Sequence, residues 1–218
     1  MRNTLALGGA VVLAAGVLLG CSATQMQVPT DLGDGPEVIP IDRPKVTSAI
    51  GTQEFKMGPY TAKEFDLGGT GTSSMGAGGF SKSESSQDVT YTLHGPEGAK
   101  VGAKCEIATS QKAIGGFGKV NKTLSCEFDD GSKLTISAGA DGTVSGGGTE
   151  LRVTATKAIE GGDTSTFKPT GYLFYQGDSQ VGGVDINGTG ILYLSAQLDA
   201  PAKLLVALAA PSLLVFDE

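Results

Sequence analysis

The sequence predicts a mainly β protein: an antiparallel meander that forms a barrel or a sandwich, with one apolar C-terminal helix packed inside or against it. Three observations predict this class. Short apolar runs alternate with period two at spacings near ten residues. The 218 residues include 34 glycines without a triplet period, which is typical of a turn-rich fold. Residues 200–210 carry no polar stripe, as expected of a helix in a protein interior.

The chain starts with the features of an export signal. Arg2 and the amino terminus are positive, and residues 5–19 form an apolar run of Leu, Val, Ala and Gly. A short apolar run behind a positive start is typical of a signal peptide, whereas a membrane span needs roughly 20 residues. We therefore expect residues 1–20 to be a signal peptide. One alternative is a transmembrane anchor. The other is an ordinary secretory signal, in which the cysteine that follows it, Cys21, occurs by chance.

The apolar run ends in Leu18, Leu19, Gly20 and Cys21. These residues resemble the lipobox of bacterial lipoproteins, in which a small residue precedes an invariant cysteine, although Leu19 is large for its position. The resemblance implies a diacylglyceryl thioether on Cys21, cleavage after Gly20 and acylation of the new amino group. Ser22 resembles the residue found in lipoproteins sent to the outer membrane, where the cell has one. The implied partner is a membrane, bound through the N-terminal lipid.

The stretch after the lipobox predicts a tether. Residues 21–45 carry four prolines among acidic and small polar residues, and no apolar period runs through them. Such a composition favours an extended, partly polyproline-like chain. We expect residues 46–218 to form a single β-rich domain, held clear of the bilayer by this tether.

Alternation of apolar and polar residues predicts the strands of that domain. Val89, Tyr91 and Leu93 share one face of the first clear strand, and the turn at residues 129–131 predicts the clearest hairpin. The predicted strands are residues 88–94, 100–108, 123–128, 133–137, 150–156, 171–175, 180–186 and 190–195. Residues 68–79 and 138–148 are too rich in glycine to assign. The first stretch is either a mobile loop or a strand pair in which glycine permits close approach.

The C-terminal run predicts a buried helix. Asp199 is suited to cap its N-terminus, and a proline in the first turn loses no needed N–H. Pro211 lacks an N–H and its ring clashes with the carbonyl of Ala207, so we expect it to end or kink the helix. Residues 212–216 would then continue as a short strand.

A meandering barrel closed around a hydrophobic C-terminal helix is similar to the tubby and scramblase-like architecture. Residues 171–216 carry this resemblance through glycine-punctuated strands, Leu198 and Asp199, and an Ala/Leu helix. Members of that architecture bind phosphoinositides or other lipids through basic surface residues. The sequence shows no basic cluster, so the resemblance assigns lipid recognition to no residue. The alternative is a β-sandwich with one helix packed on it.

Two further cysteines predict a disulfide. Cys105 and Cys126 form an even pair in an oxidising compartment once Cys21 is used by the anchor, and each lies in a predicted strand. The bond would stabilise the domain by about 3 kcal/mol in the chain-entropy model. Two free buried thiols are the alternative. Two cysteines and one histidine cannot complete a zinc site, so we expect no metal.

No catalytic or cofactor motif stands out. His94 is the only histidine, and no nucleophile signature accompanies it, which favours a surface or turn residue. Residues 115–120 contain Gly-Lys, but Val120 replaces the Ser/Thr of a phosphate-binding loop, so we expect an ordinary loop. Residues 129–131 lack the acid spacing of a calcium loop. The sequence thus predicts no catalytic residue and no cofactor.

Charge and motifs narrow the function. The net charge of −7 argues against nucleic acid and against electrostatic docking of the chain on anionic lipid. The first hypothesis is therefore a membrane-anchored cell-envelope lipoprotein, facing the periplasm or the cell surface, with a non-catalytic binding or structural β-domain. The alternative is a carrier of lipid or of a small apolar ligand inside the barrel. An enzyme is the third.

Overall fold

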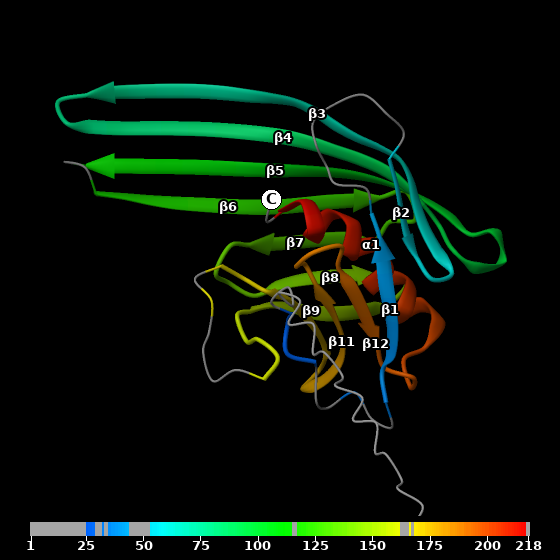
Figure 1. Ribbon diagram of the computed structural model, residues 1–218. Helices are drawn as coiled ribbons and strands as arrows, with labels where there is room; N and C mark the ends of the chain where they lie inside the picture. Colours follow the sequence, from blue (N-terminus) through cyan, green and yellow to red (C-terminus); the bar gives the residue numbers. More distant parts are fainter. Residues whose placement is uncertain are drawn as a thin grey trace, which may run out of the picture.

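The computed structural model describes residues 25–28, 32, 35–43, 53–114, 117–161, 166 and 168–216. These residues form a closed antiparallel barrel and one helix, which confirms the predicted fold class (Figure 1). The elements are β1 (Glu37–Asp42), β2 (Gln53–Met57), β3 (Tyr60–Ala77), β4 (Phe80–His94), β5 (Lys100–Ile114), β6 (Phe117–Phe128), β7 (Lys133–Ser137), β8 (Gly142–Gly146), β9 (Thr149–Thr156), β10 (Gly171–Gln176), β11 (Ser179–Asp185), β12 (Ile191–Leu194) and α1 (Ala200–Phe216).

The barrel is a meander in which each strand pairs with its neighbours in the chain, and β1 closes the ring between β12 and β2. The alternation read from the sequence sets its inner face: Val89, Tyr91 and Leu93 are at most 2% exposed. Aromatic rings stack across that face, with centroids 4.7 Å apart for Phe55 and Phe65 and 5.5 Å for Phe65 and Tyr91. Inward side chains from the whole ring thus form one core.

Helix α1 fills the interior of this ring. Every residue from Leu205 to Phe216 is buried, so the helix forms the centre of the core (Figure 1). Asp199 accepts a hydrogen bond from the Ala202 N–H at 2.9 Å, which is the predicted N-terminal cap. The apolar run is therefore a buried core helix, as predicted.

The expected short strand at residues 212–216 is wrong, because α1 continues through Pro211 to Phe216. Two side chains donate to carbonyls in the turn that the proline disturbs. The Tyr91 hydroxyl donates to the Leu208 carbonyl, and the Ser212 hydroxyl donates to the Ala209 carbonyl at 2.9 Å. Burial raises the pKa of Tyr91, so its hydroxyl keeps the proton that it donates. Enclosure by the barrel leaves these residues no free sheet edge to join.

The barrel begins earlier than the sequence suggests. Strand β1 lies inside residues 21–45, the predicted tether, and buries Ile39 and Ile41. Pro40 is compatible with strand β1 because no hydrogen bond to β12 is needed at its nitrogen. The Ile41 N–H donates to the Gly190 carbonyl on the β12 side, so the nitrogen of Pro40, which carries no hydrogen, faces the other neighbour. That neighbour, β2, pairs with β1 only at Ile41 and Asp42.

The first described residues pack on the outside of the barrel. Met26 and Leu32 contact Tyr193 in a small apolar cluster of their own. The Met26 N–H donates to Oδ2 of the buried Asp185 at 2.9 Å, and the Asn187 N–H donates to Oδ1 at 2.8 Å. Burial raises the pKa of Asp185, and the N–H donors of Asn187 and Met26 oppose that rise. The signal peptide and Cys21 lie outside the described residues.

Both glycine-rich stretches are largely strand and turn. The first, residues 68–79, is the outer part of β3 and its turn into β4, which is the strand-pair alternative. In the second, residues 138–148, a Cβ on Gly146 would lie 1.9 Å from the Ser132 hydroxyl and 3.1 Å from Leu205 of the helix. Glycine there lets β8 approach both the loop before β7 and α1, because no side chain would fit.

Candidate functional site

Strands β3 to β6 run far beyond the barrel and form a four-stranded sheet of their own (Figure 1). We call this sheet the arm; it comprises residues 68–88, 108–114 and 117–122. In the described part of the chain, β2 pairs with β3 only as far as Phe65, and β7 pairs with β6 only from Thr123 onward. Both edges of the arm therefore carry backbone groups without a neighbouring strand.

The disulfide lies at the root of the arm. Cys105 and Cys126 are directly opposite one another on β5 and β6 and are bonded, with their Cα atoms 4.0 Å apart, so the predicted pair is confirmed. The next pair on the same face, Ile107 and Leu124, lies nearer the free end of the arm and is still buried. Beyond it the core ends and the arm begins.

A second contact ties the root to the helix. Lys122, the next inward-facing residue of β6, donates from Nζ to the Phe216 carbonyl at the end of α1. The same ammonium lies 5.0 Å from the centroid of the Phe216 ring. A cation at a helix C-terminus satisfies an unpaired carbonyl and interacts favourably with the helix dipole. The arm therefore leaves the barrel from a point fixed by covalent and polar bonds.

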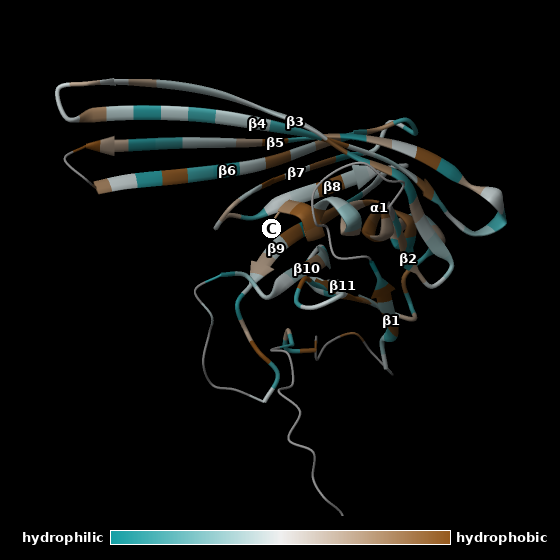
Figure 2. Cartoon of the chain, turned by 45° about the horizontal axis from the view of Figure 1, so that its top comes forward, coloured by the Kyte–Doolittle hydropathy of each residue, from teal (hydrophilic) through white to brown (hydrophobic). Residues whose placement is uncertain are grey.

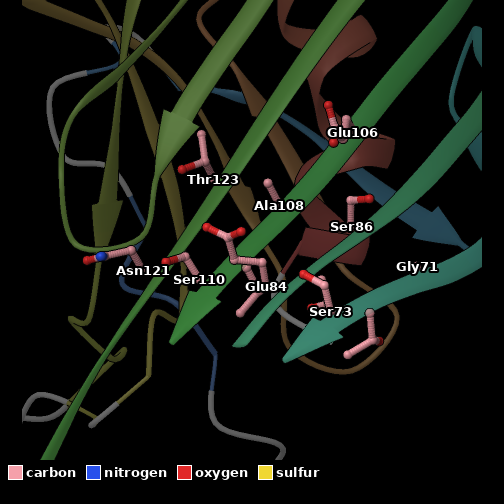
Figure 3. Close-up of a pocket in the computed structure, with 12 residues that line it drawn as sticks. Gly71, Ser73, Glu84, Ser86, Glu106, Ala108, Ser110, Asn121 and Thr123 are labelled. Atoms are coloured by element: carbon pink, nitrogen blue, oxygen red, sulfur yellow. The ribbon is translucent and has the colours of Figure 1, made fainter. Parts of the chain in front are cut away.

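A polar trough lies over the arm and its root, on the face turned away from the barrel interior (Figure 3). Paired residues share a face, so the register places Gly71, Ser86, Ala108 and Thr123 in one row across the four strands. The next row toward the free end is Ser73, Glu84, Ser110 and Asn121. Small side chains in the first row make the hollow, which has a volume of about 490 Å³.

The trough offers hydrogen bonds and negative charge. Hydroxyl groups line it together with the carboxylates of Glu84 and Glu106. The Lys82 ammonium lies 2.7 Å from Glu84 and partly offsets its charge. His94 lies at the opposite end of β4, paired with Thr61 and Lys100, so the trough does not include it. The described residues contain no group of three or more His, Cys, Asp or Glu side chains placed to hold a metal ion.

The same outward face ends in two rows of different chemistry. The outermost row is Ala77, Phe80, Ile114 and Phe117, and the row behind it is Met75, Lys82, Lys112 and Lys119. Figure 2 shows the free ends of β4 and β6 in brown, followed by a hydrophilic band. The expected loop at residues 115–120 is therefore wrong for residues 117–120, which belong to β6; residues 115–116 lie outside the described part.

Comparison with protein-family models, curated proteins and solved structures finds no match for this chain. The similarity to the tubby and scramblase-like architecture therefore stays a prediction. Among the described residues, no helix has the length and apolar character needed to cross a membrane.

The sequence did not predict the arm because neither face of its strands is apolar along its length. Residues 80–87 read Phe-Ser-Lys-Ser-Glu-Ser-Ser-Gln, in which no two-residue period separates a buried side from an exposed one. The sequence offered only an indirect sign of the arm. The segments that continue directly from two predicted strands contain Ser, Thr, Gly and Lys, and they contain no proline that would end a strand. Only the pairing of β3 to β6 shows that lysines far apart in the sequence form one row.

Proposed function

We propose that the protein is a lipid-anchored, non-catalytic domain of the bacterial cell envelope that binds its partner through the arm. The filled barrel is the observation that carries this proposal. Helix α1 occupies the space in which a barrel would otherwise hold a ligand, and its residues from Leu205 onward are buried. A binding surface must then lie outside the barrel, and the arm is an exposed element that four strands build beyond it.

The competing proposal, a carrier of lipid or of a small apolar ligand, requires space inside the barrel. Such a ligand would have to displace α1, which is capped by Asp199 and bonded to the wall through Tyr91. Removing a helix from the centre of the core would expose most of the apolar surface that stabilises the fold. The geometry therefore favours external binding over transport in the interior.

The proposed anchor rests on the sequence. Cys21 follows a small residue at the end of a short apolar run, and two or three acyl chains hold a protein firmly on a bilayer. Ser22 supports an outer-membrane location in a cell with two membranes. The first test is metabolic labelling with a palmitate analogue. We expect label on the wild type and none on Cys21→Ala; label that survives the substitution would contradict the anchor.

The second test asks which surface binds. A photo-crosslinking residue at Ser110, in the trough, should capture an envelope component in living cells, whereas the same residue at the exposed barrel position Thr135 should not. Capture from Thr135 alone would refute binding through the arm. Lipid that co-purifies with the chain in stoichiometric amount and is retained when the arm is removed would instead support the carrier.

A further inference from the structure

Exposed apolar side chains are concentrated at the free end of the arm. Of the six large apolar residues that the described part of the chain exposes, five lie there. Phe117 is 87% exposed, Met75 70%, Ile114 69% and Phe80 40%, all on the outward face, while Val120 is on the opposite face. A cluster of this kind on a polar sheet has no role in the barrel core, which ends at Ile107.

Lysines flank the apolar cluster on the same face. Lys82, Lys112 and Lys119 are directly paired across β4, β5 and β6, one residue row behind the outermost one. The carboxylate of Glu84 contacts only the first of them, at 2.7 Å. Like charges placed directly opposite one another destabilise a sheet, so this row costs stability in the isolated protein. A partner with negative charge would remove that cost.

The net charge of −7 does not set the sign of the electrostatic field at the free end of the arm. From the last buried residue of β5, Ile107, to Lys112 the strand advances ~17 Å at about 3.4 Å per residue. Charges are screened over about 8 Å at physiological ionic strength. The acidic groups of the barrel are therefore too far away to cancel the lysines, and the local field is positive.

The two faces of the free end differ. The outermost row of the face turned toward the barrel side holds Gly76, Ser81, Ala113 and Gly118, which are small, and the next row holds Ser74, Ser83, Gln111 and Val120. The outward face holds the bulky apolar row and the lysine row. An apolar edge followed by cations on one side is the arrangement of an element that lies in a lipid–water interface. There, apolar groups enter the acyl region, and lysine stems follow them while the ammonium groups reach the phosphates.

We propose that the free end of the arm docks on a bilayer containing anionic phospholipid. Phe80, Ile114 and Phe117 insert at the acyl boundary, and Lys82, Lys112 and Lys119 bind the headgroup phosphates. This inference rests on the proposed function in that it names the partner of the arm. It is independent of the lipid on Cys21, because the first described residues pack on β10 to β12, across the ring from the strands that form the arm.

The experiment uses the chain from Ser22 onward, which keeps every strand and the helix but cannot be acylated at Cys21. Its binding to vesicles of phosphatidylcholine with about a third phosphatidylglycerol is compared with binding to pure phosphatidylcholine by flotation. We expect binding to the anionic vesicles that weakens with added salt. Each lysine near the surface should contribute about fivefold, so Lys82→Ser, Lys112→Ser and Lys119→Ser together should weaken binding by about a hundredfold.

Matched variants separate the site from general charge. Replacing three exposed barrel lysines, Lys56, Lys104 and Lys157, by Ser changes the net charge by the same amount as the triple arm variant. This barrel variant should still bind the anionic vesicles through the free end of the arm. Phe117→Ser should weaken binding at least about tenfold. It should leave the melting temperature unchanged, because the ring is exposed. Equal loss in the barrel variant, or no binding by the wild type, would overturn the proposal.

A second copy of the chain is the other occupant to test, because both arm edges are open. Sedimentation velocity on the same samples distinguishes it. A dimer that Phe117→Ser abolishes, without vesicle binding, would overturn the lipid proposal. Crosslinking from Ser110 to an envelope protein would still stand in that case, so failure of the lipid inference and failure of the proposed function give different results.

Discussion

The barrel and the arm are built from the same four strands but are stabilised differently. In the barrel each strand of the β3–β6 group buries one face in the core that contains α1, and Val89 and Leu93 are at most 1% exposed. In the arm neither face meets a core, and only backbone pairing, with the root held by Cys105–Cys126 and Lys122, keeps the strands together. A hydrogen-bonded ladder can thus extend well past the core that sets its register.

This contrast predicts that barrel and arm respond unequally to substitution. The net contribution of a hydrogen bond between exposed strands is small, whereas a filled core provides most of the free energy of unfolding. Changes inside the ring should therefore affect the whole molecule. Changes in the arm should affect mainly what the arm binds, with only a small effect on stability.

The largest effect is expected from the helix. Leu205→Asp places a carboxyl group without a partner where the side chain is 3% exposed and touches β8, at a cost of several kcal/mol, which is a large part of the 5–15 kcal/mol that holds a typical domain together. We expect no cooperative thermal transition by circular dichroism for the chain from Ser22. Ala200→Asp, exposed in the first turn of the same helix, is the control and should melt like the wild type. An unchanged melting temperature for Leu205→Asp would contradict the core position of α1.

Removal of the disulfide should have the next largest effect. Cys105 and Cys126 are 21 residues apart, and closing a loop of this size stabilises a protein by about 3 kcal/mol. The double Ser variant should lose about that much free energy of unfolding in a urea titration. Reductant should destabilise the wild type equally and leave the double variant unchanged. If reductant also destabilised the double variant, the bond would not be the cause.

A smaller effect is expected at the contact between the N-terminal segment and the barrel. Asp185→Asn turns one acceptor into a donor that meets the Met26 N–H, and a buried donor without a partner costs about 1–3 kcal/mol. Hydrogen exchange at Met26 should become faster while the exchange of the β4 amides inside the barrel keeps its rank. Equal acceleration at both places would show that the substitution acts on the whole barrel.

The same residue predicts a pH dependence. Burial raises the pKa of Asp185 in the folded protein, so its contribution to stability is complete below the unfolded pKa, near the ordinary Asp value, and is lost as pH rises through the folded value. The free energy of unfolding of the wild type, minus that of Asp185→Asn, should therefore increase as pH falls through this window. Urea titrations at several pH values measure it, and the opposite slope would refute the direction.

The smallest effect on stability is expected from the largest deletion. Replacing residues 73–84 and residues 110–121 each by Asn-Gly keeps the pairs Thr72–Ser85 and Thr109–Lys122, and this dipeptide favours a tight hairpin turn. Lys122 also keeps its bond to Phe216. We expect the midpoint in urea to change little and vesicle binding to be lost. A collapse of stability would show that the arm contributes to the fold.

The barrel could be predicted from the sequence because the burial of one face of each strand produces a regular alternation of apolar and polar residues. Val89, Tyr91 and Leu93 alternate with polar residues, Asp129 to Gly131 mark a turn, and the run after Asp199 has no polar face. The course of the chain after Pro211 could not be read, because propensity predicts a break. In the structure the surrounding wall holds the helix and bonds the Leu208 carbonyl.

The sequence by itself determined the fold class, the disulfide pair, the buried helix and its cap, because alternation and all-round apolarity report burial directly. Only the tertiary structure shows the arm, with its outermost apolar row and the lysine row behind it. Lys82, Lys112 and Lys119 lie on three strands, and no local pattern connects them. The physical reason is register: the core fixes how β4, β5 and β6 align at Cys105 and Cys126, and backbone pairing carries that alignment outward to residues that have no core of their own.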